Sequence, residues 1–270
     1  MILAGNETMT PDLSGSIAAI GRYAPVIFQA MARSHERFIY PSRRELTFEI
    51  RLRNKTIEAA QALHRSRAAF ATFYYSACNE AYWSLTGEGG FDLKPGRPAA
   101  EAIRDIFENG EAYAFECATA MMIVFYKALI DCLPEERFNS IFSHLYLWDW
   151  QNHPFFSLKN ASRVGTGIPG DVRYFKNPDV NPQTPQWQGE NAVDLSGGLY
   201  YGHGIGIMTA DRIIEELNQY RRQSADTSAY LMPGATRPDY LSLAAFDAGT
   251  PSDGIRIAAG SSVYTFSSFA

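Results

Sequence analysis

A cysteine at the start of a predicted helix is the residue of this sequence best placed for covalent chemistry. Cys117 lies where a loop opened by Asn109 and Gly110 gives way to an apolar run of Ala, Met, Ile, Val and Phe. Unpaired N–H groups and the positive dipole end of a helix's first turn stabilise a thiolate, so this position is expected to lower the cysteine pKa. Glu116, directly before it, can cap the helix or accept the proton. The alternative is a cysteine that fills the core, as free cysteines often do.

Two polar residues later in the chain could act with this thiol, which needs a group that takes its proton and returns one to a leaving amine. A generic thiol hydrolase would use His203, in YYGHGIG, where Gly202 and Gly204 leave room for close approach. Glu190, in QWQGEN, lies near Trp187, and an aromatic wall would desolvate its carboxylate and raise its pKa. The structural alternatives are a strand histidine bonded to backbone and an exposed turn glutamate.

Length and composition are those of an ordinary globular protein. The 270 residues suffice for one large domain or two small ones, and 46% are hydrophobic and 20% charged. The 17 Phe, 15 Tyr and 4 Trp favour a β-containing core and an aromatic-walled cleft. A net charge of −5 argues against nucleic-acid binding, which needs a basic surface.

The cysteines and the apolar segments indicate a protein made inside the cell. Three cysteines cannot all pair within one chain, and no CxxC or Cys/His cluster indicates zinc. The N-terminus MILAGNETMT has no basic region and no long apolar core, so no secretory signal is predicted. The most apolar run, AMMIVFY, is far below the roughly 20 residues that span a bilayer. We therefore expect reduced thiols, a cytosolic compartment and no membrane.

The hydrophobic pattern predicts helices first and a sheet later. The clearest helix covers residues 41–66, with its charges on a solvated face and His64 as a terminal packing residue. Helices are predicted at residues 10–31 (kinked or broken by Pro25), 41–66, 97–109, 117–131, 134–138 and 209–222. Strands are predicted at residues 70–75, 82–85, 144–150, 171–175, 191–195, 199–207 and 228–232, with a turn at the glycines 87, 89 and 90 and a loop at 151–170.

This order of elements predicts a single α+β domain over residues 1–245, and a papain-like arrangement is one way to build it. After about residue 243 the chain turns to Ala, Gly, Ser and Thr. Residues 246–270 are therefore expected to form an additional low-complexity tail, poorly ordered or wrapped over the domain.

Longer motifs occur together and in a fixed order: ENGEAYAFECATA, YFKNP, QWQGEN and YYGHGIGI. With FEIRLRN and SAYLMPGATR, they make residues 34–237 resemble the small bacterial spore-coat transglutaminases, protein-glutamine γ-glutamyltransferases of the Bacillus type. The resemblance implies a compact papain-like, NlpC/P60-related domain, in which the nucleophilic cysteine begins a helix packed on a mostly antiparallel sheet. It also implies a calcium-independent enzyme without cofactor or metal. Such an enzyme forms ε-(γ-glutamyl)lysine cross-links between proteins through a cysteine thioester and releases ammonia.

The matching motifs carry residue roles with them. The family's nucleophile matches Cys117, its carboxylate partner Glu190 and a partly redundant second carboxylate Glu116. His203 matches the histidine of the strand motif and is expected to support the site. The aromatic residues that flank the family's substrate passage resemble Trp187, Trp150 and Phe70. By this resemblance the partners are proteins bearing glutamine and lysine, the enzyme is a monomer and its place is the spore coat.

Three segments depart from the family's pattern: residues 151–170, the stretch before residue 34 and the tail after residue 244. They leave substrate choice and surface docking open. Two rival functions also follow from the residues. One is a papain-like cysteine amidase or peptidase with His203 as base, and the other is a coat or scaffold protein that has kept the fold without the chemistry.

Overall fold

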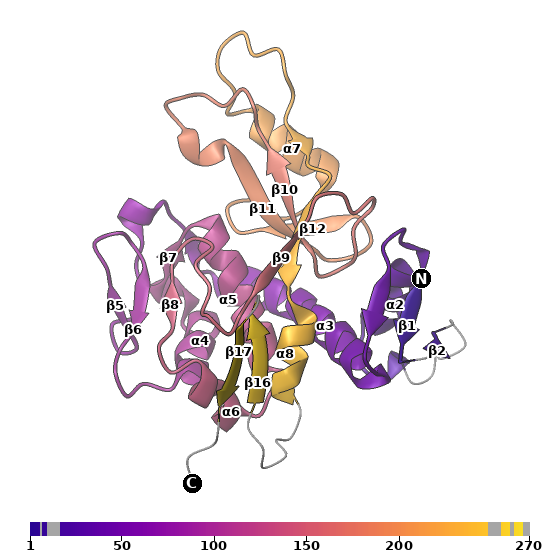
Figure 1. The fold of residues 1–270 in the computed structure, drawn as a ribbon. Coiled ribbons are helices and arrows are strands. Elements are labelled where there is room, and N and C mark those ends of the chain that lie inside the picture. Colours follow the sequence, from indigo (N-terminus) through magenta and orange to yellow (C-terminus); the bar gives the residue numbers. More distant parts are fainter. Residues whose placement is uncertain (6, 10–16, 248–254, 260–261, 267–270) are drawn as a thin grey trace.

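The computed structural model describes residues 1–5, 7–9, 17–247, 255–259 and 262–266. Long helices α3 and α5 cross the centre of the molecule (Figure 1). An antiparallel sheet with α7 forms the upper lobe of Figure 1, and α4 with three short strands forms the lobe on the left. The chain's N-terminal strands and α2 lie on the right.

The helices begin and end close to the predicted positions in most cases. They are α2 (Ala24–Arg33), α3 (Arg43–Ser66), α4 (Ala99–Glu108), α5 (Cys117–Ile130), α6 (Glu135–Ile141), α7 (Ala210–Asn218) and α8 (Tyr240–Asp247). Local signals explain several of the boundaries: the side chains of Ser42 and Thr209 cap α3 and α7, and Pro98 stands at the N-cap of α4.

The strands are short. They are β1 (Ile2–Ala4), β2 (Glu7–Thr8), β3 (Phe38–Tyr40), β4 (Ala69–Phe70), β5 (Trp83–Leu85), β6 (Phe91–Leu93), β7 (Ala114–Phe115), β8 (Tyr146–Leu147), β9 (Leu158–Ala161), β10 (Val172–Lys176), β11 (Gly189–Asp194), β12 (Leu199–Gly202), β13 (Gly206–Thr209), β14 (Tyr230–Leu231), β15 (Ala235–Pro238), β16 (Ile255–Ala259) and β17 (Ser262–Phe266). The main sheet runs β13-β12-β11-β10-β15-β9 with β14 also on β10, and all its pairs are antiparallel.

The main sheet is covered on both faces, because successive side chains of its strands point to opposite faces and both faces carry apolar residues. Val193 and Tyr201 join the large core that α3 and α5 build. Phe175, Ala192 and Tyr200 instead pack with the buried face of α7. The architecture is thus an α+β domain, with a central helix layer against an antiparallel sheet.

Helix α5 is the core of the molecule, since nearly every one of its side chains is buried. An amphipathic partner, α3, packs along it. Burial all round fixes the helix in position, so the residues at its N-terminus are held rigidly at the junction of the helix layer and the main sheet.

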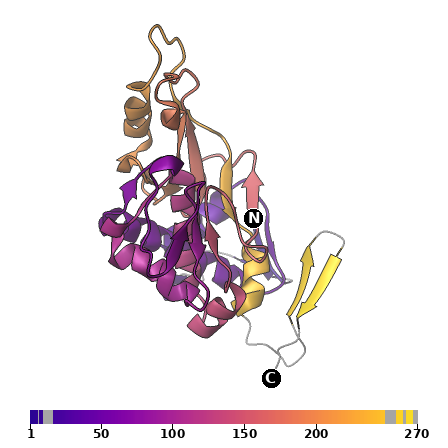
Figure 2. The same cartoon turned by 90° about the vertical axis from the view of Figure 1, so that its left-hand side faces the viewer.

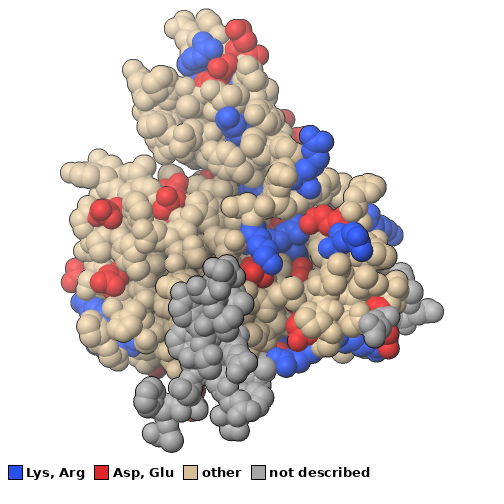
Figure 3. Space-filling view, in the orientation of Figure 1, with Lys and Arg blue, Asp and Glu red and all other residues tan. Residues whose placement is uncertain are grey.

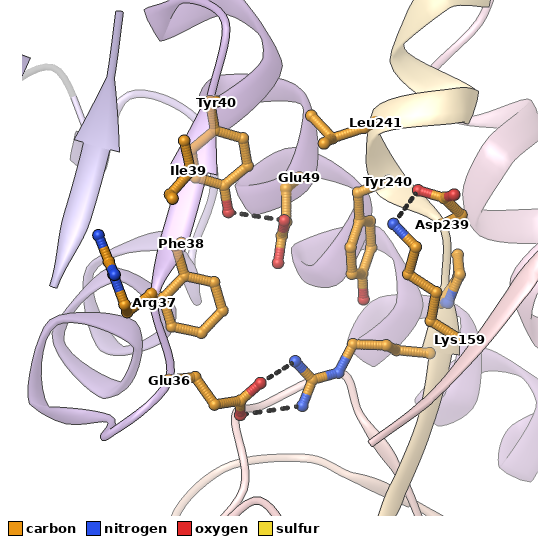
Figure 4. A pocket seen from close by; sticks show the side chains of 12 residues that line it. Glu36, Arg37, Phe38, Ile39, Tyr40, Glu49, Lys159, Asp239, Tyr240 and Leu241 are labelled. Carbon is orange, nitrogen blue, oxygen red and sulfur yellow. Dashed lines mark hydrogen bonds and ion pairs between the residues drawn. The ribbon is translucent and has the colours of Figure 1, made fainter. Parts of the chain in front are cut away.

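The predicted solvated face of α3 is wrong at Glu49 and Arg53, which are both buried. Arg53 donates to Glu49 at 2.8 Å and to Asp171 at 2.8 Å, and Arg237 reaches the same Asp171 at 2.9 Å. Figure 4 shows the outer part of this cluster, where Tyr40 donates to Glu49. Pairing of opposite charges explains why these groups tolerate burial.

Several predicted boundaries are wrong. Pro25 lies in the first turn of α2 and starts that helix rather than kinking it, while residues 10–16 of the predicted helix lie outside the described residues. Residues 70–75 give only the end of β4 and then a 3-10 turn, Phe73–Tyr75, labelled η2 here, and β5 pairs with β6 across the predicted glycine turn. The predicted strand 144–150 shrinks to β8, and the predicted loop 151–170 contains β9.

The expected C-terminal tail is partly structured. Helix α8 crosses the boundary predicted at residue 245, and Leu243, Ala244 and Phe246 are buried against the core. Strands β16 and β17 form a hairpin at the same end of the molecule (Figure 2). Residues 248–254, 260–261 and 267–270 of the predicted tail lie outside the described residues.

Candidate active site

Cys117 is the first residue of α5, and local hydrogen bonds hold it there. Glu116 is the N-cap: its Oε2 accepts from the Ala118 N–H at 2.7 Å, and its Oε1 accepts from the Cys117 thiol at 2.9 Å. The preceding strand β7 pairs in parallel with β4, and this pairing fixes the direction in which the chain enters α5. One carboxylate therefore satisfies a helix N–H and binds the thiol proton.

Asn191 approaches the sulfur from the sheet. Its Nδ2 donates to Cys117 Sγ at 3.4 Å, and across the strands it pairs with Tyr174 of β10. Sequence reasoning missed Asn191. No local signal marks it, because strand alternation turns the side chain after Glu190 toward the other face of the sheet, and only the fold brings it to Cys117.

The pKa of the Cys117 thiol is raised well above its ordinary value, not lowered as the sequence predicted. The first cause is burial, because the residue is only 4% exposed, and the negative charges of Glu190 and Glu116 add to it. The helix dipole acts in the opposite direction but falls off within the first turn. Desolvation and two carboxylates outweigh it, and the resting sulfur is a neutral thiol.

Glu190 is buried, with 2% of its surface exposed, rather than an exposed turn glutamate. Burial raises its pKa to about 8, and the charge of Glu116 contributes, while backbone N–H groups at Gly204 and His203 oppose the rise. The raised pKa agrees with the sequence prediction. At neutral pH this carboxyl group largely keeps its proton.

The glycines of YYGHGIG make space for Glu190 rather than for the histidine. A Cβ on Gly202 would lie 2.6 Å from Glu190 Oε1, whereas a Cβ on Gly204 would meet nothing closer than 3.4 Å. The absence of a side chain at Gly202 lets the Glu190 carboxyl group pack directly on the backbone of β12.

His203 is held with both ring nitrogens occupied. Nε2 lies 3.1 Å from the Ala69 carbonyl oxygen, which can only accept, so Nε2 carries the proton and Nδ1 accepts from the Tyr201 hydroxyl at 3.0 Å. The ring stacks on Phe115 at 4.4 Å, and burial lowers its pKa to about 4. This neutral histidine braces β4 and β7, the two strands that lead to Cys117, against β12.

Aromatic side chains stand around the site. The rings of Phe70 and Trp187 lie 6.0 Å apart, and Trp187 stacks on Tyr220 at 4.2 Å. A Cβ on Gly204 would touch Phe70, which places that ring beside Glu190. Trp150 is half-buried against the core and follows Asp149, whose N–H donates to Thr119 in the first turn of α5. Phe70 thus lies beside Glu190 and next to Trp187, and Trp150 lies in the loop beside the helix start.

A groove of about 360 Å³ opens on the opposite side, at Asn191 and Tyr174. It runs along the main sheet and is lined mainly by apolar and small residues of β9, β10 and the β14–β15 connection. Among its described lining residues the one charged side chain is Arg173, whose Nε and Nη2 donate to the carbonyl oxygens of Gly234 and Met232. The groove is therefore largely apolar, with one buried cation in its wall.

Two further properties bear on the class of protein. Among the described residues, no group of three or more His, Cys, Asp or Glu side chains is placed to hold a metal ion. Within the same part of the chain, no helix has the length and apolarity required to cross a membrane.

Comparison with known proteins gives consistent matches. The family described as protein-glutamine gamma-glutamyltransferase matches residues 1–247. A protein of that name from Halalkalibacterium halodurans is 43% identical over 226 residues, covering 84% of this chain and 76% of that protein. Another, from Bacillus subtilis, is 44% identical over 218 residues, covering 80% and 88%. The solved structure of a transglutaminase from Geobacillus stearothermophilus, without its C-terminal extension, matches with a TM-score of 0.73 and 48% identity over 76% of this chain and 98% of that one.

Proposed function

The chain belongs to the protein-glutamine γ-glutamyltransferase family, an enzyme family that cross-links proteins, and we propose that Cys117, Glu116 and Glu190 perform this reaction together. The observation that carries the proposal is the environment of the sulfur. The Cys117 thiol donates to Glu116 at 2.9 Å, and the buried Glu190 acts on it electrostatically. One group can take the thiol proton while the other holds a proton for the leaving group.

The first half of the reaction acylates the enzyme. As Cys117 Sγ attacks the γ-carboxamide carbon of a protein glutamine, the thiol proton passes to Glu116. The protonated Glu190 gives its proton to the amide nitrogen, the C–N bond breaks, and ammonia leaves a γ-glutamyl thioester behind. The Asn191 side-chain amide, which donates to the sulfur, and the Cys117 backbone N–H at the start of α5 would donate to the developing oxyanion.

The second half transfers the acyl group to lysine. The ionised Glu190 takes a proton from the lysine ε-amine, whose nitrogen attacks the thioester carbon and forms the isopeptide bond. The C–S bond breaks, and the sulfur recovers its proton from Glu116. Both carboxyl groups then have their initial protonation states again, and Glu190 has served first as the acid and then as the base.

Two approaches to the sulfur suit the two substrates. The largely apolar groove at Tyr174 and Asn191 would accept the glutamine-bearing segment. The side formed by Phe70 and Trp187 would accept lysine, since its aromatic walls can cover the alkyl stem while Glu190 meets the amine. Trp150 would close the passage beside the helix start. Exclusion of water by these rings favours transfer over hydrolysis of the thioester.

The finer family traits belong to the same proposal. A cysteine at a helix N-terminus packed on an antiparallel sheet supports a papain-like, NlpC/P60-related core. We further propose a monomer that acts without calcium on glutamine- and lysine-bearing proteins of the spore coat.

The test is incorporation of a fluorescent primary amine into casein in the presence of a calcium chelator. We expect labelling by the wild type, none by Cys117→Ala, and a loss of about 10²- to 10⁴-fold in Glu190→Gln, the usual range for an acid–base group. Glu116→Gln should lose less if Glu190 can substitute for it. Absence of labelling by the wild type would refute the proposal.

The rival hydrolase differs from the transferase at His203. A general base needs a ring nitrogen directed at the thiol, whereas here both nitrogens are bonded elsewhere. His203→Gln is therefore expected to keep acyl transfer within about tenfold, because glutamine can still donate to the Ala69 carbonyl oxygen. Complete loss of activity in this variant, with Glu190→Gln active, would favour the hydrolase.

A further inference from the structure

An exposed aromatic surface borders the lysine side of the site and has no role in the chemistry above. It consists of Phe73, Tyr74 and Tyr75 of η2 together with Trp148, and we name these four residues the aromatic rim. Tyr74 is 88% exposed and Tyr75 72% exposed, which is unusual for large aromatic side chains.

The aromatic rim is continuous with the active site in two directions. It follows β4, whose neighbour Ala71 donates to the Phe115 carbonyl oxygen, two residues before Cys117. Phe73 packs on Trp148 with ring centres 5.4 Å apart, and the next residue, Asp149, donates to Thr119 in the first turn of α5. A protein bound on the aromatic rim would therefore reach the lysine side of the sulfur.

Hydrogen bonds and close packing hold the aromatic rim in place. Trp148 Nε1 donates to the Glu88 carbonyl oxygen at 3.0 Å, which ties the rim to the β5–β6 turn. In that turn Gly89 has φ +85°, and a Cβ there would overlap the Phe73 carbonyl group, so the turn packs directly under η2. The rings of Tyr74 and Tyr75 meet edge to face at 5.0 Å, which leaves ring faces open to solvent.

The surroundings of the aromatic rim are acidic. Glu88 is exposed and Asp149 is half-buried, and neither forms an ion pair with another described residue. Acidic side chains also predominate on the left-hand lobe in Figure 3, to which the rim belongs.

We propose that the aromatic rim, with Glu88 and Asp149, docks the acyl-acceptor protein by a positively charged segment around the reactive lysine. Open tyrosine faces attract Lys and Arg side chains, and unpaired carboxylates complement their charge. The enzyme thereby selects lysines in basic surroundings. This inference rests on the proposed transferase function.

The test compares acceptors with the full-length enzyme and one small glutamine donor. Three acceptors are used: a small fluorescent primary amine, a peptide with one lysine between arginines, and the same peptide with the arginines replaced by serines and the other amines blocked. For wild type we expect a lower KM for the basic peptide, with an advantage that falls as salt rises.

The key variant is Tyr74→Ser with Tyr75→Ser, at two exposed positions whose change should not disturb the fold. Loss of two cation–π contacts predicts a KM about 10-fold higher for the basic peptide. The kcat for this peptide and the KM for the small amine should stay the same. Glu88→Gln should reduce the salt dependence. The matched control is Tyr230→Ser, at a tyrosine 41% exposed on β14, and it should change nothing.

The outcomes separate the two proposals. If the wild type incorporates none of the acceptors, the transferase proposal itself fails. Two results would refute the docking role of the aromatic rim while the small amine is still incorporated. One is an equal KM of the wild type for both peptides, and the other is an equal rise in KM for both peptides in the double variant.

Discussion

Glu190 is predicted to lower the stability of the enzyme at the pH at which the enzyme works. Its pKa rises from 4.5 to about 8 because the folded protein removes it from water. In the unfolded chain the same group titrates near 4.5, so between these two values the folded state holds a proton that the unfolded state has released. The stabilising contribution of this group is complete below pH 4.5 and is lost as the pH rises to about 8.

The size of the effect follows from the two pKa values. Each pH unit in this window costs about 1.4 kcal/mol of unfolding free energy, so the rise from pH 5 to pH 7 costs about 3 kcal/mol. Glutamine resembles the protonated acid in shape and carries no charge, so Glu190→Gln removes this dependence. Any unpartnered N–H of the new amide costs the same at both pH values and cancels from the comparison. Asp194, whose pKa is raised to about 6, titrates in both proteins and cancels as well.

The assay is urea denaturation of wild type and Glu190→Gln at pH 5 and pH 7, with Glu108→Gln as a control at an exposed glutamate. We expect the wild type to lose about 3 kcal/mol more than Glu190→Gln between the two pH values, and the control to follow the wild type. Equal pH dependence in all three proteins would mean that Glu190 is not desolvated, and its role as a proton donor would lose its physical basis.

Two further predictions concern the residues that shape the site and the core. Gly202→Ala is expected to lower labelling about 10²-fold, because its Cβ would lie 2.6 Å from Glu190 Oε1 and displace the carboxyl group. Gly204→Ala, where the nearest atom is 3.4 Å away, should label at nearly the wild-type rate. Equal rates in the two variants would contradict this account. Arg53→Met should reduce the free energy of unfolding by about 3 kcal/mol in chemical denaturation, because two buried carboxylates lose the cation they share and keep only Arg237 at Asp171 and Tyr40 at Glu49. The exposed Arg43–Glu7 pair is the control, and Arg43→Met should cost less than about 1 kcal/mol.

The sequence predicted the elements whose signals are local. Pro98 and Thr209 mark helix starts by their own chemistry, and the structure begins helices there. The helix expected from residue 41 begins at Arg43, after the N-cap Ser42. The start of α5 at Cys117 was equally readable, since a polar residue precedes a long apolar run. For the same reason the sequence found Glu116 as the N-cap of this helix.

Distant contacts explain most of what the sequence could not predict. Arg53 is buried because Asp171, 118 residues away, meets it, and no periodicity within α3 reveals that partner. The thiol pKa was predicted in the wrong direction because the helix dipole is visible in the sequence, while burial and the carboxylate from β11 appear only after folding. The 3-10 turn at residues 73–75 replaced the predicted strand: Phe73 packs on Trp148, and Tyr74 and Tyr75 are exposed and lack a strand to pair with.

The raised thiol pKa suits a transferase better than the expected lowered one. A persistent thiolate would react with any electrophile that reached it, whereas the Cys117 proton stays on sulfur while Glu116 accepts its hydrogen bond. In the proposed mechanism the attacking sulfur gains full nucleophilicity only as an amide carbon approaches and Glu116 takes the proton. In the same proposal the low exposure of Cys117 and Glu190 protects the thioester, because it leaves little room for a competing water molecule. Selectivity for an amine over water would thus come from burial, and the loss of thiol acidity is its physical consequence.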